Sequence, residues 1–333
     1  MGVRLTNYIH FSKSYDGYTN LAADGLFLDT LQKGDIMLYM YVNENAVIIG
    51  RNQNAWRECN LMSMERDGVQ LVRRHTGGGA VYHDKGNLNF SFIMSEKDYD
   101  LQRQFKVVMN AIKKHGLEPE LSGRNDILVD GKKFSGNAYA LSKGNRAHHG
   151  TLLINTDMSR LGNYLNVSKA KLMAKGVESV RSRVCNLSSF VPDITVERMS
   201  EMLIESFVEE YGEAVEYPIN DTVLSNIEHR RDQQISWEWR FGKAPECENF
   251  VEQRFSFGEM QMHFTIKNGR IAKLMLYSDS MDTTLVSRLT YVLKGCKFER
   301  NALREAFLKI DNKEVAREIV DFMENRGQLA NPE

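Results

Sequence analysis

Two arginines that lead into three consecutive glycines are the residues best suited to chemistry in this sequence. Only His75 and Thr76 separate Arg73 and Arg74 from the glycines at 77–79. A guanidinium group carries a fixed charge and a planar set of donors that matches phosphate or carboxylate. Successive glycine N–H groups can form an anion-binding nest, and glycine lets the main chain lie close to a ligand. The pattern therefore indicates a cradle for phosphate or carboxylate.

The residues after the glycines exclude two common phosphate-binding motifs. A Walker loop needs Gly-Lys followed by Ser or Thr, but Gly79 is followed by Ala-Val-Tyr. A dinucleotide-binding fingerprint needs glycine in place of Tyr82 and then a helix, whereas residues 87–93 are typical of a strand. The glycines alone leave open a glycine-rich hairpin with exposed arginines.

A hairpin that carries two lysines is the second candidate. Asp130 and Gly131 lie between two strand-like segments, which predicts a two-residue type I′ turn. That turn fixes three facing pairs, which are Val129 with Lys132, Leu128 with Lys133, and Asp126 with Ser135. Because side chains alternate along a strand, Lys133 shares one face with Leu128, Ser135 and Asp126, and Lys132 points to the other.

The predicted place of Lys133 suits it to stabilise negative charge. The Asp126 carboxylate would lie on the diagonal, within reach of a long side chain, and an opposite charge keeps an ammonium group protonated. A held cation of this kind stabilises charge that develops on phosphoryl and acyl oxygens. The alternative is a hairpin tip with two solvated lysines, which is the common fate of surface lysine.

The arginine–glycine segment resembles a known family. Residues 73–87, Arg-Arg-His-Thr-Gly-Gly-Gly-Ala-Val-Tyr-His-Asp-Lys-Gly-Asn, are similar to the lipoate-binding loop of lipoate-protein ligases, which share a superfamily with biotin ligases. Further segments match in the same order, at residues 123–126 with 131–138, 148–153, 175–176 with 179–184, and 236–239. The resemblance covers nearly the whole chain.

The resemblance implies an ATP-dependent ligase in which Lys133 is catalytic and lipoate is the substrate. It implies nucleotide binding by Arg74, Gly79, Ala80, Val81, Tyr82, Lys133 and Asp126. It implies lipoate binding by Arg73, Thr76, Gly77, Gly78, His83, Lys133 and His149. It also implies a mobile adenylate loop with Lys175, Gly176, Arg181, Ser182 and Arg183, for which a generic basic surface loop is the alternative. Asp126 would bind Mg²⁺ or orient Lys133.

Two other functions stay open. An amidotransferase of the same superfamily would move octanoyl or lipoyl groups through an acyl-cysteine at Cys185, although this position resembles a threonine of many ligases. A non-catalytic binder of lipoyl proteins or nucleotide would release no pyrophosphate. The implied partner is a lipoyl-acceptor domain, either the glycine cleavage H protein or the acyltransferase subunit of a 2-oxoacid dehydrogenase.

Composition and charge narrow the class of protein. The 43 basic and 44 acidic residues give a formal charge of −1, which argues against nucleic acid or membrane as a partner. The four cysteines include no Cys-x-x-Cys pair, and adjacent His148 and His149 would point to opposite faces of a strand, so no zinc site is predicted. Without a recognisable leader or spanning segment, we expect a cytoplasmic protein, and we expect a monomer.

The elements that must position these residues follow from apolar spacing and caps. Helices are predicted at residues 18–32, 60–66, 99–115 and 195–211, and strands at 35–42 and 46–49. Residues 241–249 have breaker composition, and a hairpin with an Asn-Gly turn at 268–269 and helical stretches around 284–293 and 302–323 follow. We therefore expect an α+β fold: a large catalytic domain, residues 1–243, of mixed, mainly antiparallel sheets flanked by helices, and a small α+β accessory domain, residues 250–333.

Overall fold

The computed structural model describes residues 6–123, 125–166, 184–241 and 249–326. Within these ranges the strands are β1 (Asn7–Phe11), β2 (Ile36–Val42), β3 (Ala46–Ile49), β4 (Gln70–Arg73), β5 (Val81–His83), β6 (Asn87–Ser95), β7 (Pro119–Ser122), β8 (Asp126–Val129), β9 (Lys132–Ser142), β10 (Asn145–Leu153), β11 (Ala214–Glu216), β12 (Asn249–Phe255), β13 (Gly258–Lys267) and β14 (Arg270–Ser278). The helices are α1 (Gly17–Thr30), α2 (Ala55–Glu58), α3 (Leu61–Arg66), α4 (Leu101–Lys113), α5 (Met158–Tyr164), α8 (Val196–Tyr211), α9 (Asp221–Ile235), α10 (Trp237–Arg240), α11 (Leu285–Leu293), α12 (Arg300–Leu308) and α13 (Lys313–Arg326). None of these helices is long and apolar enough to span a membrane.

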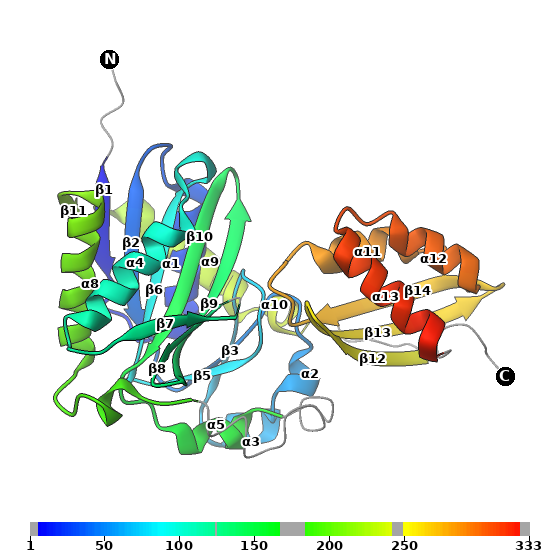
Figure 1. Ribbon diagram of the computed structural model, residues 1–333, viewed down its shortest axis with the longest axis horizontal. Helices are drawn as coiled ribbons and strands as arrows, with labels where there is room; N and C mark the ends of the chain where they lie inside the picture. Colours follow the sequence, from blue (N-terminus) through cyan, green and yellow to red (C-terminus); the bar gives the residue numbers. More distant parts are fainter. Residues whose placement is uncertain (1–5, 124, 167–183, 242–248, 327–333) are drawn as a thin grey trace.

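A large mixed sheet forms the centre of the N-terminal part, with strand order β11-β1-β2-β6-β10-β9-β8-β7 (Figure 1). Strand β1 is parallel to β11 and β2, and the remaining pairs are antiparallel. One face packs on α4 and α8 through Phe92, Val108 and Phe207. The other face packs on α1 and α9 through Tyr39 and Phe27. The alternation of side chains along each strand thus feeds two separate cores.

A smaller sheet, β4-β3-β5, presents the arginine–glycine segment. Strand β4 is parallel to β3 and ends at Arg73, and β5 is antiparallel to β3 and begins at Val81. The glycines at 77–79 therefore form the connection between the two strands that flank β3. The sheet rests on α3 and α5 through a core that includes Tyr82 and Tyr164.

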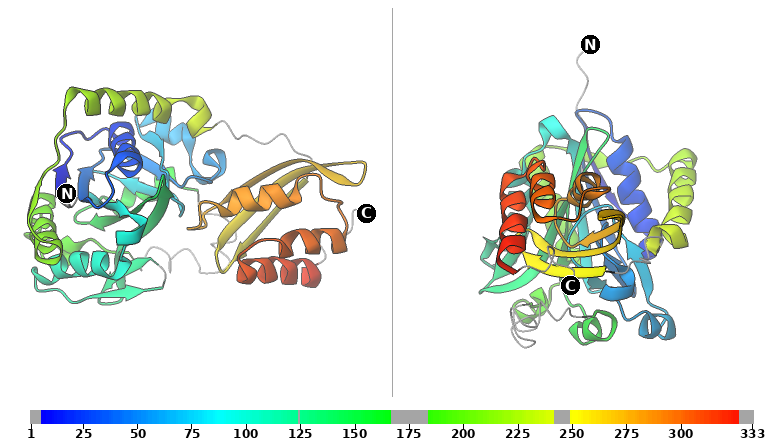
Figure 2. Two further views of the ribbon diagram at one scale, coloured as in Figure 1. Left: turned by 90° about the horizontal axis from the view of Figure 1, so that it is seen from above. Right: turned by 90° about the vertical axis from the view of Figure 1, so that its right-hand side faces the viewer.

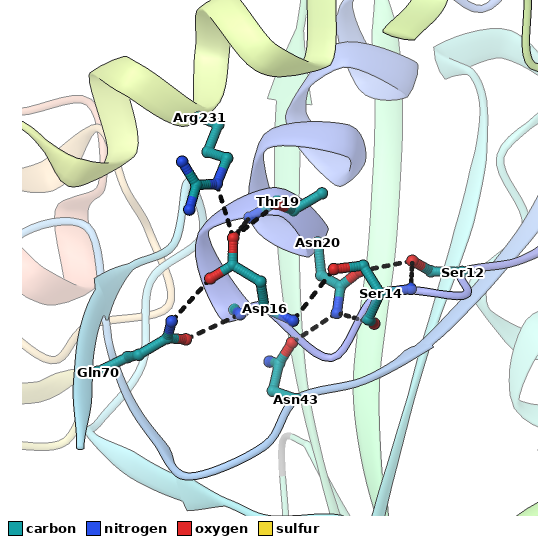
Figure 3. A network of polar contacts seen from close by, with 9 residues as sticks. Ser12, Ser14, Asp16, Thr19, Asn20, Asn43, Gln70 and Arg231 are labelled. Carbon is teal, nitrogen blue, oxygen red and sulfur yellow. Dashed lines mark hydrogen bonds and ion pairs between the residues drawn. The ribbon is translucent and has the colours of Figure 1, made fainter. Parts of the chain in front are cut away.

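Helix α1 begins at a polar network that Figure 3 shows. The Asp16 carboxylate accepts from Thr19 N at 3.2 Å and Thr19 Oγ1 at 2.6 Å, and it also accepts from Gln70 and Arg231, both at 2.7 Å. These bonds cap the helix and join it to β4 and α9. The buried side of α1 packs on the large sheet through apolar side chains such as Phe27 against Tyr39.

The part of the chain from residue 249 has a hydrophobic core of its own. Strands β12, β13 and β14 form an antiparallel sheet that α11, α12 and α13 cover on one side (Figure 2). The bounds 1–243 and 250–333 of the two expected domains stay a prediction. The whole architecture confirms the α+β prediction, with a large mixed sheet flanked by helices and a small C-terminal domain.

The structure corrects two details of the sequence analysis. The stretch at 302–323 is two helices, because Asn312 accepts from Val315 N at 3.2 Å and so caps the start of α13. In the lysine hairpin the first two pairs are as predicted, but Asp126 faces Gly136 instead of Ser135, because a bulge follows Ile127. The type I′ turns are confirmed by positive φ at Asp130, Gly131, Asn268 and Gly269.

Candidate functional site

A cavity of about 310 Å³ opens between the large sheet and the glycine segment. Its wall is mostly apolar, and two cations lie on it, Arg74 and Lys133. The same wall holds several of the predicted site residues, which are Gly78, Gly79, Ala80, Val81, Tyr82, His83 and His149. An apolar cavity with a few polar groups is the usual form of a small-molecule site.

Arg74 holds the glycine segment in shape from the cavity wall. Its Nε donates to Thr76 Oγ1 at 3.1 Å and to Gly77 O at 3.0 Å. Its Nη2 donates to the carbonyls of Gly77 at 2.6 Å and Gly79 at 2.8 Å, and its Nη1 to Ile48 O at 3.1 Å. Burial lowers the pKa of Arg74 to about 10. The guanidinium therefore organises the main chain, and the predicted contact with nucleotide phosphate stays a prediction.

Arg73 lies elsewhere, behind the small sheet. It donates to the carbonyls of Gly50, Arg51 and Gln53 at 2.7–3.0 Å, and also to the main chain of α10 through Trp239 O and Arg240 O. It lines a separate cavity of about 120 Å³ next to Trp239. The guanidinium thus fastens α10 to the small sheet, and it does not border the cavity where lipoate binding was predicted.

A chain of buried hydrogen bonds connects Arg74 to helix α1. Thr76 Oγ1 lies 2.7 Å from His149 Nε2, and His149 Nδ1 lies 3.3 Å from the Asp24 carboxylate. A carboxylate only accepts, so it favours the proton on Nδ1 and leaves Nε2 as the acceptor of the Thr76 hydroxyl. The order Thr–His–Asp resembles that of a nucleophile triad. However, Thr76 is 2 % exposed and does not border the cavity, so the chain positions Arg74.

Lys133 enters the cavity from the hairpin of β8 and β9. Its Nζ lies 2.7 Å from Asp126 Oδ1, and both side chains are about one-third exposed, at 33 % and 36 %. A Cβ atom at Gly136 would lie 3.1 Å from this Nζ, so the lysine extends across the glycine that the bulge places there. The predicted ion pair is present, and Lys132 is exposed. Asp126 touches the cavity only through Lys133.

Comparisons with known proteins now identify the family. The model of the lipoyl protein ligase A/B catalytic domain matches residues 16–208, and that of the bacterial lipoate protein ligase C-terminus matches residues 244–323. This chain belongs to the lipoyl protein ligase family.

Three similar solved structures have the same fold. P. falciparum LipL1 in complex with lipoate is 30 % identical with a TM-score of 0.84, over 95 % of this chain and 99 % of that one. A bipartite lipoate protein ligase of Thermoplasma acidophilum, studied with its E2 lipoyl domain, is 31 % identical with a TM-score of 0.65, over 73 % and 99 %. A lipoate-protein ligase A bound with ATP is 30 % identical with a TM-score of 0.63, over 72 % and 99 %.

Part of the cavity wall was not predicted from the sequence. Four uncharged polar residues of the large sheet border the cavity, and these are Asn87, Asn89, Asn137 and Thr151. The first two are 0 % and 2 % exposed and point to the same face of β6. In the sequence they alternate with Leu88 and Phe90. This pattern predicts a polar strip on one face of a buried strand, and it could have identified these residues.

Some predicted residues of this ligase-family site lie outside the described ranges. These are Lys175, Gly176, Arg181, Ser182 and Arg183. His148 and His149 point to opposite faces as expected, because His148 bonds Gln104 at 3.0 Å on the α4 side and His149 bonds Thr76. In the described ranges no group of three His, Cys, Asp or Glu side chains could hold a metal ion.

The C-terminal part touches the glycine segment directly. Gly78 N donates to Ser280 O at 3.3 Å, and a Cβ atom at Gly77 would lie 2.1 Å from the same oxygen. Met281 also borders the cavity. In this arrangement the glycine at 77 is needed for the close approach of the segment after β14, and its contact with lipoate stays a prediction.

Proposed function

We propose that this chain is an ATP-dependent lipoate-protein ligase that works in two steps. A lipoate carboxylate oxygen attacks the α-phosphorus of ATP, the bond to the β-phosphate oxygen breaks, and pyrophosphate leaves. The ε-amine of an acceptor lysine then attacks the lipoyl carbonyl carbon. The bond to the AMP oxygen breaks, AMP leaves, and the amine loses a proton.

The observation that carries this proposal is a cation on the wall of an apolar cavity. Lys133 Nζ lies next to Gly136, which has no side chain to block it. The apolar wall suits a lipoyl chain, and the ammonium group suits the carboxylate and phosphate oxygens that must meet at one point. Phosphoryl transfer needs positioning and charge stabilisation more than covalent help, so these groups are sufficient.

The Lys133–Asp126 pair also supports the proposal. A carboxylate 2.7 Å from the ammonium group holds it in one place, and Lys133 can then stabilise charge without reorganisation. Asp126 would hold Mg²⁺ only together with ATP phosphates, because this ion is commonly held by one or two carboxylates and substrate phosphates. The ion would neutralise charge on the ATP phosphates.

The position of Cys185 favours the ligase over the acyl-cysteine amidotransferase. Its thiol packs in the main core with Leu187, lies 3.7 Å from Lys132 O, and does not border the cavity, whereas Val184 does. Burial raises the pKa of the Cys185 thiol, so little thiolate is present at neutral pH. A cysteine nucleophile would instead have to border the cavity and to have a lowered pKa, so that thiolate is present.

We propose a lipoyl domain as the acceptor, from the H protein or an acyltransferase subunit, and a cytoplasmic monomer as the working form. The Thermoplasma ligase that was studied with an E2 lipoyl domain supports this kind of partner. An acceptor of this class presents one lysine for modification.

The proposal is tested by pyrophosphate release from ATP and lipoate, followed by the mass of an added lipoyl domain. We expect release that depends on lipoate, and a mass increase of one lipoyl group that requires ATP. The Cys185→Ala variant is the matched test of the rival, and it should keep both activities. Transfer from a lipoylated or octanoylated protein without ATP, abolished by Cys185→Ala, would establish the amidotransferase instead.

A further inference from the structure

His83 is joined to the polar network at the start of α1 through two buried asparagines (Figure 3 shows the first part of this network). Asn20 Nδ2 donates to Asn43 Oδ1 at 2.9 Å, and Asn43 Nδ2 lies 3.2 Å from His83 Nδ1. The two asparagines are completely buried, and His83 is 4 % exposed. The three side chains therefore form a fixed hydrogen-bond chain.

The orientation of each group in this chain follows from the one before it. Asn20 Nδ2 faces the carbonyls of Ser14 at 2.9 Å and Val42 at 3.0 Å, and Asn20 Oδ1 accepts from Ser12 Oγ at 2.7 Å, so this amide cannot be reversed. The oxygen of Asn43 must then face Asn20, and its nitrogen must face His83.

An amide nitrogen cannot accept, so His83 Nδ1 is the acceptor. Burial lowers the pKa of His83 to about 3, and the neutral ring therefore carries its proton on Nε2. His83 borders the cavity, and within the described residues its Nε2 has no hydrogen-bond partner. A buried N–H without a partner is costly, and such groups in native proteins call for an explanation.

This N–H lies at the end of the cavity opposite Lys133. The cavity wall crosses four neighbouring strands through Tyr41, Asn89, Thr151 and Gly136. Three strand spacings separate the first from the last, about 14 Å. Lys133 Nζ lies beside Gly136, whereas Asn43, which holds His83, directly follows β2 on the Tyr41 side.

Among the described residues, two more of the cavity wall carry a buried polar atom without a partner. Asn87 Nδ2 donates to Asn89 Oδ1 at 3.1 Å, and within the described residues Asn87 Oδ1 has no partner, nor does Thr156 Oγ1. Asn87 is completely buried and Thr156 is 4 % exposed. A purely hydrocarbon occupant would leave the His83 N–H without an acceptor, whereas a sulfur atom can accept from it. The donor at His83 therefore suits an acyl chain that carries an acceptor heteroatom at this end.

We propose that the His83 Nε2–H is a specificity-determining donor that recognises a sulfur atom of the dithiolane ring, so that the site selects lipoate over the sulfur-free octanoate. The inference rests on the proposed function and adds the acyl group that the site selects. Lipoate would lie with its carboxylate at Lys133 and its ring at His83. Asn20 and Asn43 are positioning residues, because they act only through the tautomer of His83.

The test compares kcat/KM for lipoate and octanoate in pyrophosphate release, for the wild type and two variants. His83→Phe keeps a ring of similar size without a donor, and the lipoate-to-octanoate ratio should fall about threefold to tenfold, as expected for loss of one neutral hydrogen bond to a weak acceptor. His83→Gln can present an amide N–H where Nε2 lies, and it should restore most of the ratio. An unchanged ratio in His83→Phe would overturn the inference.

A second measurement uses only the wild-type protein, so it does not depend on whether a variant folds. In ¹⁵N NMR of the wild type, His83 should show the Nε2–H tautomer, and its Nε2 signal should shift with lipoate more than with octanoate. The Nδ1–H tautomer, or equal shifts with both acids, would contradict the inference. If the wild type releases no pyrophosphate with either acid, the proposed ligase activity fails, and the NMR comparison still decides what His83 recognises.

Discussion

Asp24 is a buried carboxylate of α1 that reaches the cavity only through His149 and Thr76. In an Asp24→Asn variant the amide can donate to His149 Nδ1 as well as accept from it, so the tautomer is no longer fixed. The Thr76–His149 bond and the orientation of Arg74 should weaken, and we expect a loss of about tenfold in kcat/KM for adenylate formation, in line with a lost charge-assisted hydrogen bond.

Asp29 provides the matched control for this prediction. It lies on the same helix and bonds Ser142 at 2.6 Å and Arg230 at 2.7 Å, but it does not border the cavity. Asp29→Asn should keep the activity of the wild type. Equal losses in the two variants would mean that a general weakening of α1, and not the chain to Arg74, causes the effect.

The buried histidines predict how stability depends on pH. Burial lowers the pKa of both His83 and His148 to about 3, against about 6.5 in the unfolded chain. Between these values the unfolded state binds more protons, so the free energy of unfolding falls as the pH drops below 6.5, by about 1.4 kcal/mol per pH unit for each histidine. Urea unfolding at pH 7 and pH 5 measures this loss. In His83→Gln the loss in free energy of unfolding should be smaller by the contribution of one histidine. A loss equal to that of the wild type would contradict the lowered pKa of His83.

Single residues were predictable where a turn fixes the register. The Asp-Gly turn is a local signal, and it alone predicts that Lys133 lies beside Asp126. The roles of Arg73 and Arg74 could not be distinguished in this way. The two residues are adjacent and identical, and the sequence does not show which face of the strand borders the cavity. Asp24 carries no motif, and its partners lie more than 50 residues away along the chain.

At the scale of elements, the start of α1 depends on Asp16. Burial opposes its charge, but hydrogen bonds from Thr19, Arg231 and Gln70 outweigh burial, and the pKa of Asp16 is lowered. Asp16→Ala should lower the free energy of unfolding by about 1–2 kcal/mol at pH 7. A group with a depressed pKa stabilises the fold above its unfolded pKa and loses this effect as the pH falls through the folded value, so the penalty should shrink toward pH 3.

The N-cap of α9 serves as the comparison for Asp16. Asn220 accepts from Val223 N at 3.0 Å and is uncharged, so Asn220→Ala should cost less and show no such dependence on pH. Urea unfolding of both variants at pH 7 and pH 3 measures the difference. A penalty for Asp16→Ala that stays constant with pH would show that its charge does not contribute.

Caps and apolar spacing predicted most elements, because both are local signals. Thr195 and Gly212 bound α8 as expected, and Asn60 caps α3. The bulge after Ile127 was not predictable, because it depends on how β9 meets its other neighbours. The break before α13 could have been found, since Asn312 is a good cap inside an otherwise helical stretch.

At the scale of the whole molecule, Gly77 marks the contact between the catalytic and C-terminal parts. A Cβ atom there meets Ser280 O at 2.1 Å and Met281 Cα at 3.0 Å, both main-chain atoms that cannot rotate away. Gly77→Ala should therefore loosen this contact, at a cost of about 1–3 kcal/mol, and increase hydrogen exchange in residues 278–283. At Gly79 no atom lies within 4 Å of an added Cβ, so Gly79→Ala should leave this exchange unchanged. Similar exchange in both variants would contradict the prediction.

The presence of a small C-terminal domain was predictable, but its contact with the glycine segment was not. Breaker composition at 241–249 is visible in the sequence, whereas the bond from Gly78 N to Ser280 O joins residues about 200 positions apart. Because the sequence does not show this contact, the pattern of glycines alone suggests only a ligand-binding role. In the structure the glycines have different roles, since Gly77 makes room for Ser280 and Gly79 borders the cavity.

The most direct test of the account is lipoate-dependent pyrophosphate release by Lys133→Ala beside Lys132→Ala. We expect Lys133→Ala to lose at least about 100-fold in turnover, because it removes the cation at the reacting oxygens. Its melting temperature should change little, because a partly exposed ion pair is worth about 0–1 kcal/mol. Lys132→Ala, whose side chain is exposed on the other face, should keep its activity. Substantial turnover in Lys133→Ala, or an equal loss in both variants, would contradict the central claim.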